Sequence, residues 1–208
     1  MHNVQVEREH YFNWRYIKAE RWMSYWHQLE NVVSTKPQSV LEIGVGNSIV
    51  RETLKKLNIQ VTTVDIDASL NPDLVASVVK LPLADNSFDT VLAAEILEHI
   101  PFGELENALG ELHRVSQEYV VISLPHVGSQ FMLSFKIPLL KKVTVFFKVP
   151  HFWKTKTSTP EHHWEIGMSG FSLARIRHQF KEARFRVLKA RGYADDPAHI
   201  HFILEKHD

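Results

Sequence analysis

Short, largely unbroken apolar runs alternate with segments of helical spacing through most of the chain. The apolar runs cover residues 40–43, 61–64, 88–94 and 119–124, and a further short strand is expected at 74–79. Before the last run, apolar residues recur at intervals of three and four at Leu105, Ala108, Leu109 and Leu112. Strands without polar alternation are typical of a parallel sheet covered on both faces, and the spacing between them predicts helices. The pattern therefore predicts an α/β fold with a mostly parallel sheet.

The two ends of the chain carry further elements. Residues 10–33 are rich in aromatic side chains, and a helix face is predicted from the apolar positions 22, 25, 26, 29, 32 and 33. We expect this helix to end before Pro37. The segment from Tyr11 to Tyr16 precedes the regular face and is a candidate to close over a ligand. Near the other end, Ser172 is placed to cap a helix, and closing strands are expected at 185–190 and 198–204.

Residues 126–168 show no clear period. Prolines occur at positions 138, 150 and 160, and aromatic residues are scattered between them. A connection of this length inside a compact domain is usually functional when it is ordered. We therefore expect an insertion that forms a lid or wall.

The composition excludes several classes of protein. The 208 residues suffice for one well-buried domain, and 24 Lys and Arg residues balance 24 Asp and Glu residues, so net charge favours neither nucleic acid nor a membrane as partner. With no cysteine, disulfides, thiolate zinc sites and cysteine nucleophiles are excluded. The first residues show no charged region followed by an apolar one, so no signal peptide is expected. The apolar run 137–149 is too short and too charged to span a membrane. A cytoplasmic location is the default expectation.

The stretch from Ser39 to Asp67 carries the strongest chemical signal. A strand ends at Gly44-Val45-Gly46, a helix that Asn47 or Ser48 can cap follows and buries positions 50, 54 and 57, and a second strand ends in Asp65. This order suits a nucleotide-like ligand at the carboxyl ends of two parallel strands, where Asp65 can accept both ribose hydroxyls. Position 49 is not the third glycine of a dinucleotide site, and the carboxylate of Glu42 would attract a cation. We therefore expect a positively charged nucleoside.

Three motifs in this order, VLEIGVGNS, VDID and LPLADNSFDTVLAAEILEHI, resemble the class I S-adenosylmethionine-dependent methyltransferases. The resemblance covers residues 39–124 and is closest to the small-molecule branch, which is type 11-like and quinone-biosynthesis-like. It implies a Rossmann-like, seven-stranded, mostly parallel sheet with helices on both faces and an antiparallel last strand. S-adenosyl-L-methionine would be the cofactor. The expected organisation is an N-terminal helical cap (1–36), a cofactor-binding core (37–124), an insertion or lid (125–170) and a closing helix with strands (171–208).

The resemblance also implies roles for individual residues. Glu42, Gly44, Gly46, Ala94 and Glu95 would line the methionine part of the cofactor, Asp65 would bind the ribose and Ile66 would pack on the adenine. The full set of expected cofactor-binding residues is Glu42, Gly44, Gly46, Asn47, Ser48, Asp65, Ile66, Asp67, Ser77, Val78, Ala94 and Glu95. Two positions depart from the family pattern. Ser48 occupies the position of the family's usual third glycine. Ser77 occupies the position of the acidic residue that commonly meets the adenine amino group, which leaves Val78 to help hold the adenine.

Catalytic and metal-binding roles depend on the histidines. The candidate general bases are His126, which follows the fifth strand of the core, His99 and His163. The cluster of His162, His163 and Glu165, with His151, offers metal-ligand chemistry, but neighbouring side chains in a loop seldom converge. No metal site is therefore expected.

The acceptor is defined mainly by what the sequence lacks. The end of the 88–94 strand reads Ala93-Ala94-Glu95-Ile96, without the signature of nucleobase amino-methyltransferases, and the arginines between 175 and 191 suit a solvated surface. A small organic acceptor methylated by direct displacement is the favoured function, and nucleic acid is disfavoured. The alternatives are a nicotinamide-dependent oxidoreductase and a non-catalytic binding protein with this fold. Acceptor identity, the methylated atom and the oligomeric state stay open.

Overall fold

The computed structural model describes residues 6–14, 16–136 and 143–207. Its main element is a seven-stranded sheet of order β3-β2-β1-β4-β5-β9-β8. The strands are β1 (Ser39–Ile43), β2 (Gln60–Asp65), β3 (Leu74–Val75), β4 (Phe88–Ala94), β5 (Ser116–Pro125), β8 (Phe185–Gly192) and β9 (His199–Lys206). Strands β1 to β5 pair in parallel, whereas β9 runs antiparallel between β5 and β8. The predicted fold class is confirmed, including the antiparallel last strand.

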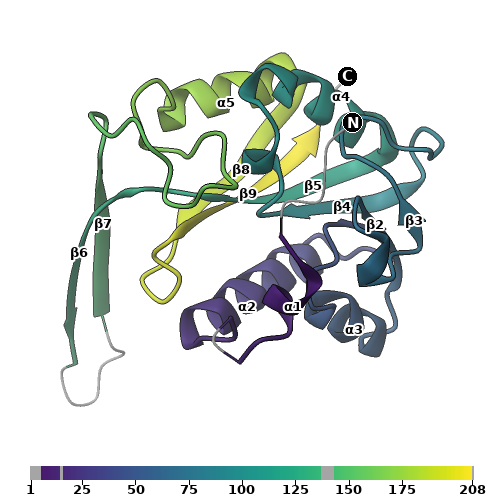
Figure 1. Cartoon of the computed structure of the whole chain (residues 1–208), viewed down its shortest axis with the longest axis horizontal. Helices are drawn as coiled ribbons and strands as arrows, with labels where there is room; N and C mark the ends of the chain where they lie inside the picture. The colour runs from purple at the N-terminus through teal and green to yellow at the C-terminus, as the bar shows by residue number, and fades with distance from the viewer. Residues whose placement is uncertain (1–5, 15, 137–142, 208) are drawn as a thin grey trace.

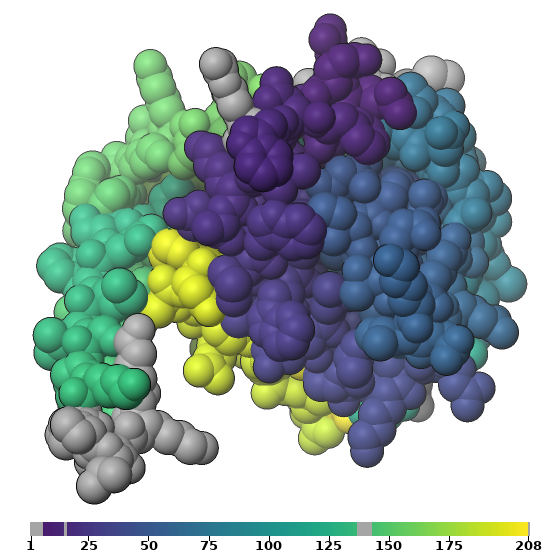
Figure 2. Space-filling model, turned by 90° about the horizontal axis from the view of Figure 1, so that it is seen from below, coloured from purple at the N-terminus to yellow at the C-terminus, as the bar shows by residue number. Residues whose placement is uncertain are grey.

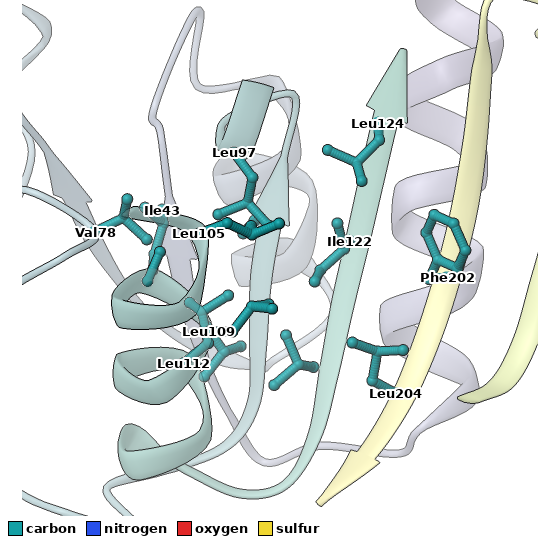
Figure 3. Packing of buried hydrophobic residues seen from close by; sticks show 14 of the residues in the cluster. Ile43, Val78, Leu97, Leu105, Leu109, Leu112, Ile122, Leu124, Phe202 and Leu204 are labelled. Atoms are coloured by element: carbon teal, nitrogen blue, oxygen red, sulfur yellow. The ribbon is translucent and has the colours of Figure 1, made fainter. Parts of the chain in front are cut away.

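Helices cover both faces of this sheet (Figure 1). They are α1 (Arg8–Tyr11), α2 (Ala19–Ser34), α3 (Ile49–Lys56), α4 (Leu105–Val115) and α5 (Leu173–Glu182), with short 3-10 turns η1 (Ala68–Leu70), η2 (Leu97–His99) and η3 (Phe102–Glu104). On the α4 and α5 face, the predicted helix positions 105, 108, 109 and 112 are fully buried against β4, β5 and β9 (Figure 3). On the other face, α2 and α3 bury a smaller cluster that includes Tyr25, Val32 and Leu54.

Helix α2 forms where it was predicted, but only part of its predicted face, including Tyr25 and Val32, is buried. Trp22 and Trp26 are about half exposed, and the buried side chains include Ser24, Gln28 and Asn31. These polar groups are paired: Gln28 donates to Ser24 Oγ (3.2 Å), and Asn31 Oδ1 accepts from Lys189 Nζ (2.7 Å). The helix therefore packs through a polar stripe, which hydropathy periodicity does not detect.

Two smaller expectations also need correction. Leu57, which was expected inside the α3 face, is more than half exposed because the helix ends at Lys56 and position 57 lies at its C-cap. The strand expected at 74–79 is confined to Leu74–Val75, and a turn closed by a Ser77–Lys80 bridge follows it. By contrast, Ser172 Oγ caps α5 as predicted, accepting from Arg175 N (3.2 Å).

The insertion contains a β-hairpin that was not predicted. Strands β6 (Gly128–Phe135) and β7 (Val143–Pro150) pair only with each other and project from the body of the molecule (Figure 1). Phe131, Met132 and Leu133 are consecutive and all substantially exposed, so neither face shows the alternation that marks a half-buried strand. Part of the run 137–149, namely 137–142, lies outside the described residues. Within the described part of the chain, no helix has both the length and the apolar character needed to cross a membrane.

Candidate active site

A cavity opens at the carboxyl ends of β1, β2 and β4, and we call it the first cavity. It is lined by eleven of the twelve expected cofactor-binding residues: Glu42, Gly44, Gly46, Asn47, Asp65, Ile66, Asp67, Ser77, Val78, Ala94 and Glu95. Ser48, the remaining one, is not part of the lining. Ligands of open α/β sheets bind at this end of the strands. The structure thus brings together residues that are up to 53 positions apart in the sequence, from Glu42 to Glu95.

The glycine turn after β1 requires a residue without a side chain at position 44. Gly44 has a φ of 85°, and a Cβ placed there would lie 2.1 Å from Cδ1 of Ile96. Its N–H donates to the carbonyl of Val64 (2.8 Å), which holds the turn against the end of β2. The backbone therefore forms the wall of the first cavity directly, as close approach to a ligand requires.

Asp65 fixes the same turn from the end of β2. Its Oδ2 accepts from Val45 N (2.8 Å), and its Oδ1 accepts from Asp67 N (2.9 Å). Burial raises the pKa of Asp65, and these two N–H donors oppose that rise. Each carboxylate oxygen keeps a second lone pair, so the side chain can position the turn and still accept hydroxyl donors from the cavity.

Glu42 supplies the test of whether the cavity fits a cationic cofactor. Its side chain is 4% exposed, and among the described residues its Oε2 has no hydrogen-bond partner. Burial, opposed by Arg51 and reinforced by Asp65, raises the pKa of Glu42 to about 8. A buried carboxyl group without a partner is destabilising. A positively charged ligand in the first cavity would supply the missing partner, so the residues present fit S-adenosylmethionine.

The N-terminal segment forms part of the cavity wall. Tyr11 and Tyr16, from the segment expected to close over a ligand, line the first cavity together with Arg21 and Tyr25 of α2. Asn47 Nδ2 donates to the Tyr25 hydroxyl (2.9 Å), which ties the glycine turn to α2. Figure 2 shows the N-terminal segment and α2 forming much of one face of the molecule. Arg21 was missed because an isolated arginine beside an aromatic stripe carries no sequence signal of its own.

A second cavity shares a wall with the first. Tyr11, Tyr16, Arg21, Glu95 and His99 line both. The other residues that line the second cavity come mainly from the insertion and from the loop before β9. They include His126, His151, Lys154, Glu161, His162, Glu165 and His199. The insertion therefore does provide a wall beside the first cavity, through residues 125–130 and 151–165.

A buried ion-pair chain organises this shared wall. Glu95 ends β4 with a φ of 55°, a conformation that non-glycine residues rarely adopt. Its Oε2 lies 2.9 Å from His199 Nε2, and His199 Nδ1 lies 2.6 Å from Asp196 Oδ1. Although burial opposes it, the two carboxylates raise the pKa of His199 to about 10. Both ring nitrogens therefore donate, and His199 is a fixed cation rather than a base.

His199 and Asp196 were missed by the sequence interpretation. The segment Asp195-Asp196-Pro197-Ala198-His199-Ile200-His201 does carry a signal, because acidic and imidazole side chains crowd at the start of a predicted strand. The position of this segment beside Glu95 follows from the insertion of β9 next to β5, which the chain order alone does not reveal.

The three candidate bases occupy different environments. His126 lines the second cavity, and its Nε2 is buried with no partner among the described residues. His99 lines both cavities, and burial lowers the pKa of each of these two histidines to about 4. His163 is exposed and lines neither cavity. The geometry thus separates His163 from the site and keeps His126 and His99 in it.

Comparisons with known proteins agree with this geometry. Residues 41–121 match the model of a family described as a methyltransferase domain. None of the curated proteins matches the chain.

Three solved structures show the shared fold. The 1,6-didemethyltoxoflavin-N1-methyltransferase of Burkholderia thailandensis, solved with 1,6-didemethyltoxoflavin and S-adenosylhomocysteine, is 14% identical over 96% of this chain and 85% of its own, with a TM-score of 0.64. The N-methyltransferase NodS of Bradyrhizobium japonicum WM9, solved with S-adenosylhomocysteine, is 12% identical over 96% of each chain, with a TM-score of 0.63. An S-adenosylmethionine-dependent methyltransferase from Clostridium acetobutylicum ATCC 824 is 10% identical over 92% of this chain and 93% of its own, with a TM-score of 0.60.

The family match covers the strands and turns that build the first cavity. The methyltransferase strand order and the unpartnered carboxyl group of Glu42 favour a sulfonium cofactor over the nicotinamide alternative. Over residues 41–121 the chain matches a methyltransferase-domain family, and the whole chain shares its fold with S-adenosylmethionine-dependent methyltransferases.

Proposed function

We propose that this protein is an S-adenosylmethionine-dependent methyltransferase that acts on a small, polar organic acceptor bound in the second cavity. The observation that carries the proposal is the wall shared by the two cavities, in which Glu95 and His99 face both. An acceptor in the second cavity would lie next to the methionine end of a cofactor in the first. The lining of the second cavity carries charged groups of both signs, which favours a polar ligand: Arg21, Lys154 and His199 beside Glu95, Glu161 and Glu165.

In this proposal the protein contributes to catalysis mainly by positioning the reactants and excluding water, and less by acid or base catalysis. When bound, S-adenosylmethionine supplies an electrophilic methyl group on a sulfonium. Tyr11 and Tyr16 border both cavities and limit the access of water to the place where they meet. Holding two reactants in line lowers a barrier by roughly 7–11 kcal/mol. These residues can therefore account for much of the rate without a strong base.

His126 is the favoured proton acceptor in this proposal. Burial and the neighbouring Lys148 lower its pKa to about 4, so the ring is neutral near neutral pH and its Nε2 can accept a proton. Because such a base is weak, it suits an acceptor whose proton becomes acidic during methyl transfer. The Lys148 amine donates to the carbonyls of His126 and Pro197 and holds this part of the wall in place.

The acceptor class can be tested by following a labelled methyl group. The protein is incubated with methyl-labelled S-adenosylmethionine and a cell extract that is afterwards separated into small-molecule, protein and nucleic-acid fractions. We expect the enzyme-dependent label in the small-molecule fraction. Label that accumulates only in protein or nucleic acid would overturn the proposal.

The role of His126 has its own test. His126→Ala should lower turnover about 100-fold or more while leaving the affinity for S-adenosylhomocysteine unchanged, because His126 does not line the first cavity. His178→Ala is the control, since His178 is exposed on α5 away from both cavities. Equal losses of turnover and cofactor affinity would indicate that His126 acts on structure instead.

A further inference from the structure

Three metal-ligand side chains converge where the two cavities meet. One donor atom from each of Glu98, His99 and His162 lies within 4.8 Å of the others. Glu98 and His99 belong to η2, which follows β4, whereas His162 comes from the loop between β7 and α5. His99 and His162 both line the second cavity. The fold, rather than a local motif, therefore creates the cluster.

His162 is held in the orientation of a metal ligand. Its Nδ1 lies 2.7 Å from Glu165 Oε1, and Glu165 also accepts from Ser158 N (2.8 Å) and Ser158 Oγ (2.9 Å). These contacts fix the Glu165 carboxyl group and, through it, the orientation of the His162 ring. The other ring nitrogen of His162, Nε2, lies 3.9 Å from Glu98 Oε1. A carboxylate behind a histidine is the usual way in which proteins orient metal-binding imidazoles.

His99 is oriented in a similar way. Its Nδ1 lies 3.2 Å from the carbonyl oxygen of Glu161, which can only accept, so Nδ1 carries the proton and Nε2 carries the lone pair. This contact fixes the orientation of the His99 ring beside Glu98 and His162.

Glu98 is the observation that points to a ligand. Its side chain is fully buried, and among the described residues neither carboxylate oxygen accepts a hydrogen bond. Buried carboxyl groups are normally hydrogen-bonded, paired with a cation or bound to a metal. The Nε2 atom of His162 lies 3.9 Å from Glu98 Oε1, beyond hydrogen-bond distance, while His162 Nδ1 pairs with Glu165. A cation held among Glu98, His99 and His162 would supply the missing partner of the Glu98 carboxyl group.

We propose that Glu98, His99 and His162 bind a divalent first-row transition-metal ion. Two imidazoles and one carboxylate form a donor set typical of iron, manganese, cobalt and zinc sites. Ligands about 2.1 Å from an ion lie up to about 4.2 Å apart, so small rotations of these side chains bring the three atoms to bonding distance. This site replaces the expectation that no metal is bound, and it differs from the loop cluster considered in the sequence because His163 is exposed and takes no part.

The position of the site gives it a role in acceptor binding. Three protein ligands leave coordination positions open, and the lining histidines place these positions toward the second cavity. An oxygen or nitrogen atom of the acceptor could occupy one of them. This consequence rests on the proposed function, whereas the metal site rests on the geometry of the cluster alone.

The test uses Co²⁺ as the probe and needs neither cofactor nor acceptor. The full chain is treated with a chelator, dialysed and titrated with Co²⁺, with calorimetry and visible absorption as readouts. We expect one equivalent to bind and to give the d–d bands of a nitrogen- and oxygen-ligated ion. Glu165→Gln should weaken binding roughly 10–100-fold, and Glu98→Gln and His162→Gln should weaken it further. His163→Gln is the matched control and should bind Co²⁺ like the unmodified chain.

Two results would overturn the proposal. One is the absence of stoichiometric Co²⁺ binding to the unmodified chain, which depends on no variant being folded. The other is Co²⁺ affinity that is unchanged in both Glu98→Gln and His162→Gln, each checked for retained S-adenosylhomocysteine binding. Because that binding and the label-transfer experiment are measured without added metal, failure of the metal site is distinguishable from failure of the proposed function.

Discussion

At the scale of single residues, position 48 shows how one side chain departs from the family without disturbing the site. Ser48 has a φ of 65°, the left-handed conformation in which related turns carry glycine. Its N–H donates to Val45 O (2.9 Å) and its carbonyl accepts from Glu52 N (3.0 Å), so the backbone holds it there. Its side chain makes no capping hydrogen bond to α3, contrary to the expected capping role. The serine is tolerated rather than required.

Ser48→Gly should therefore stabilise the protein. A non-glycine residue in the left-handed region is strained by roughly 1–2 kcal/mol, and the added flexibility of glycine in the unfolded chain offsets part of the gain. We expect the free energy of unfolding to rise by about 0.5–1 kcal/mol in urea denaturation. Ser172→Ala is the contrasting control, because loss of its cap on α5 should lower stability by about 1 kcal/mol. A loss of stability in Ser48→Gly would show an unrecognised role for the hydroxyl group.

The buried carboxyl group of Glu42 should make the stability of the protein depend on pH. Burial raises the pKa of Glu42 in the folded protein to about 8, against an ordinary value of 4.5. Between these values the folded state keeps a proton that the unfolded state has lost, so the group makes stability fall as pH rises through this window. Glu42→Gln cannot titrate. The difference in unfolding free energy between variant and parent should therefore widen by roughly 2–4 kcal/mol from about pH 5 to about pH 8. A difference that stays constant over this range would contradict the prediction.

At the scale of elements, the end of β4 and the start of β9 are joined by Glu95 and His199. Removing Glu95 leaves His199 paired with Asp196 alone, and removing His199 leaves Glu95 with only the hydrogen bond from Ser123 Oγ, so each single loss should lower stability by up to about 3–5 kcal/mol. Glu95→Gln with His199→Gln together should lose less than the sum of the single losses, by at least about 1 kcal/mol. Urea denaturation of the four proteins measures this coupling. Strict additivity would mean that the two groups do not stabilise each other.

The same pair predicts the pH range in which the coupling is largest. His199 is protonated up to about pH 10, and its contribution is fully present below its ordinary value of 6.5 and is lost as pH rises through 10. Glu95 has its pKa lowered to about 2 mainly by His199, against the effect of burial, so its contribution is lost as pH falls from 4.5 through 2. The coupling should peak between pH 4.5 and 6.5.

Elements with a buried face could be predicted from the sequence, and elements without one could not. Strands β1, β4 and β5 are buried over most of their length and appear as apolar runs. The face of α2 was predicted only in part because Asn31 Oδ1 and Gln28 Nε2 pair with Lys189 and Ser24, partners that hydropathy does not reveal. The β6–β7 hairpin was missed because most of its side chains are exposed.

The site was predictable to the same uneven degree. The first cavity is built by contiguous motifs at the ends of β1, β2 and β4, so its lining could be named residue by residue. His199, Arg21 and the association of Glu98 with His162 depend on which distant segments the fold places side by side. Long-range contacts of this kind carry no periodic signal in one sequence.

At the scale of the whole molecule, the β6–β7 hairpin forms an arm on a body that contains two buried hydrophobic clusters. No residue of β6 or β7 belongs to either cluster. Phe131 and Phe147 are direct partners across β6 and β7, and each is about half exposed. Val145 and Leu133 nearby are exposed to a similar degree or more. Burial of apolar surface is what stabilises a fold, so most of the hairpin contributes little to the stability of the body.

Shortening the arm tests this separation. Residues 132–146 are replaced by Asn-Gly, which closes a two-residue turn between the paired positions 131 and 147. We expect the free energy of unfolding to change by no more than about 1 kcal/mol and S-adenosylhomocysteine affinity to be retained. Self-association in sedimentation experiments should fall, because an exposed apolar surface has been removed. Trp164→Ala is the contrasting control. Its side chain is fully buried, so its removal should lower the free energy of unfolding by about 3–5 kcal/mol. A comparable loss in the shortened chain would show that the arm packs on the body and stabilises the second cavity.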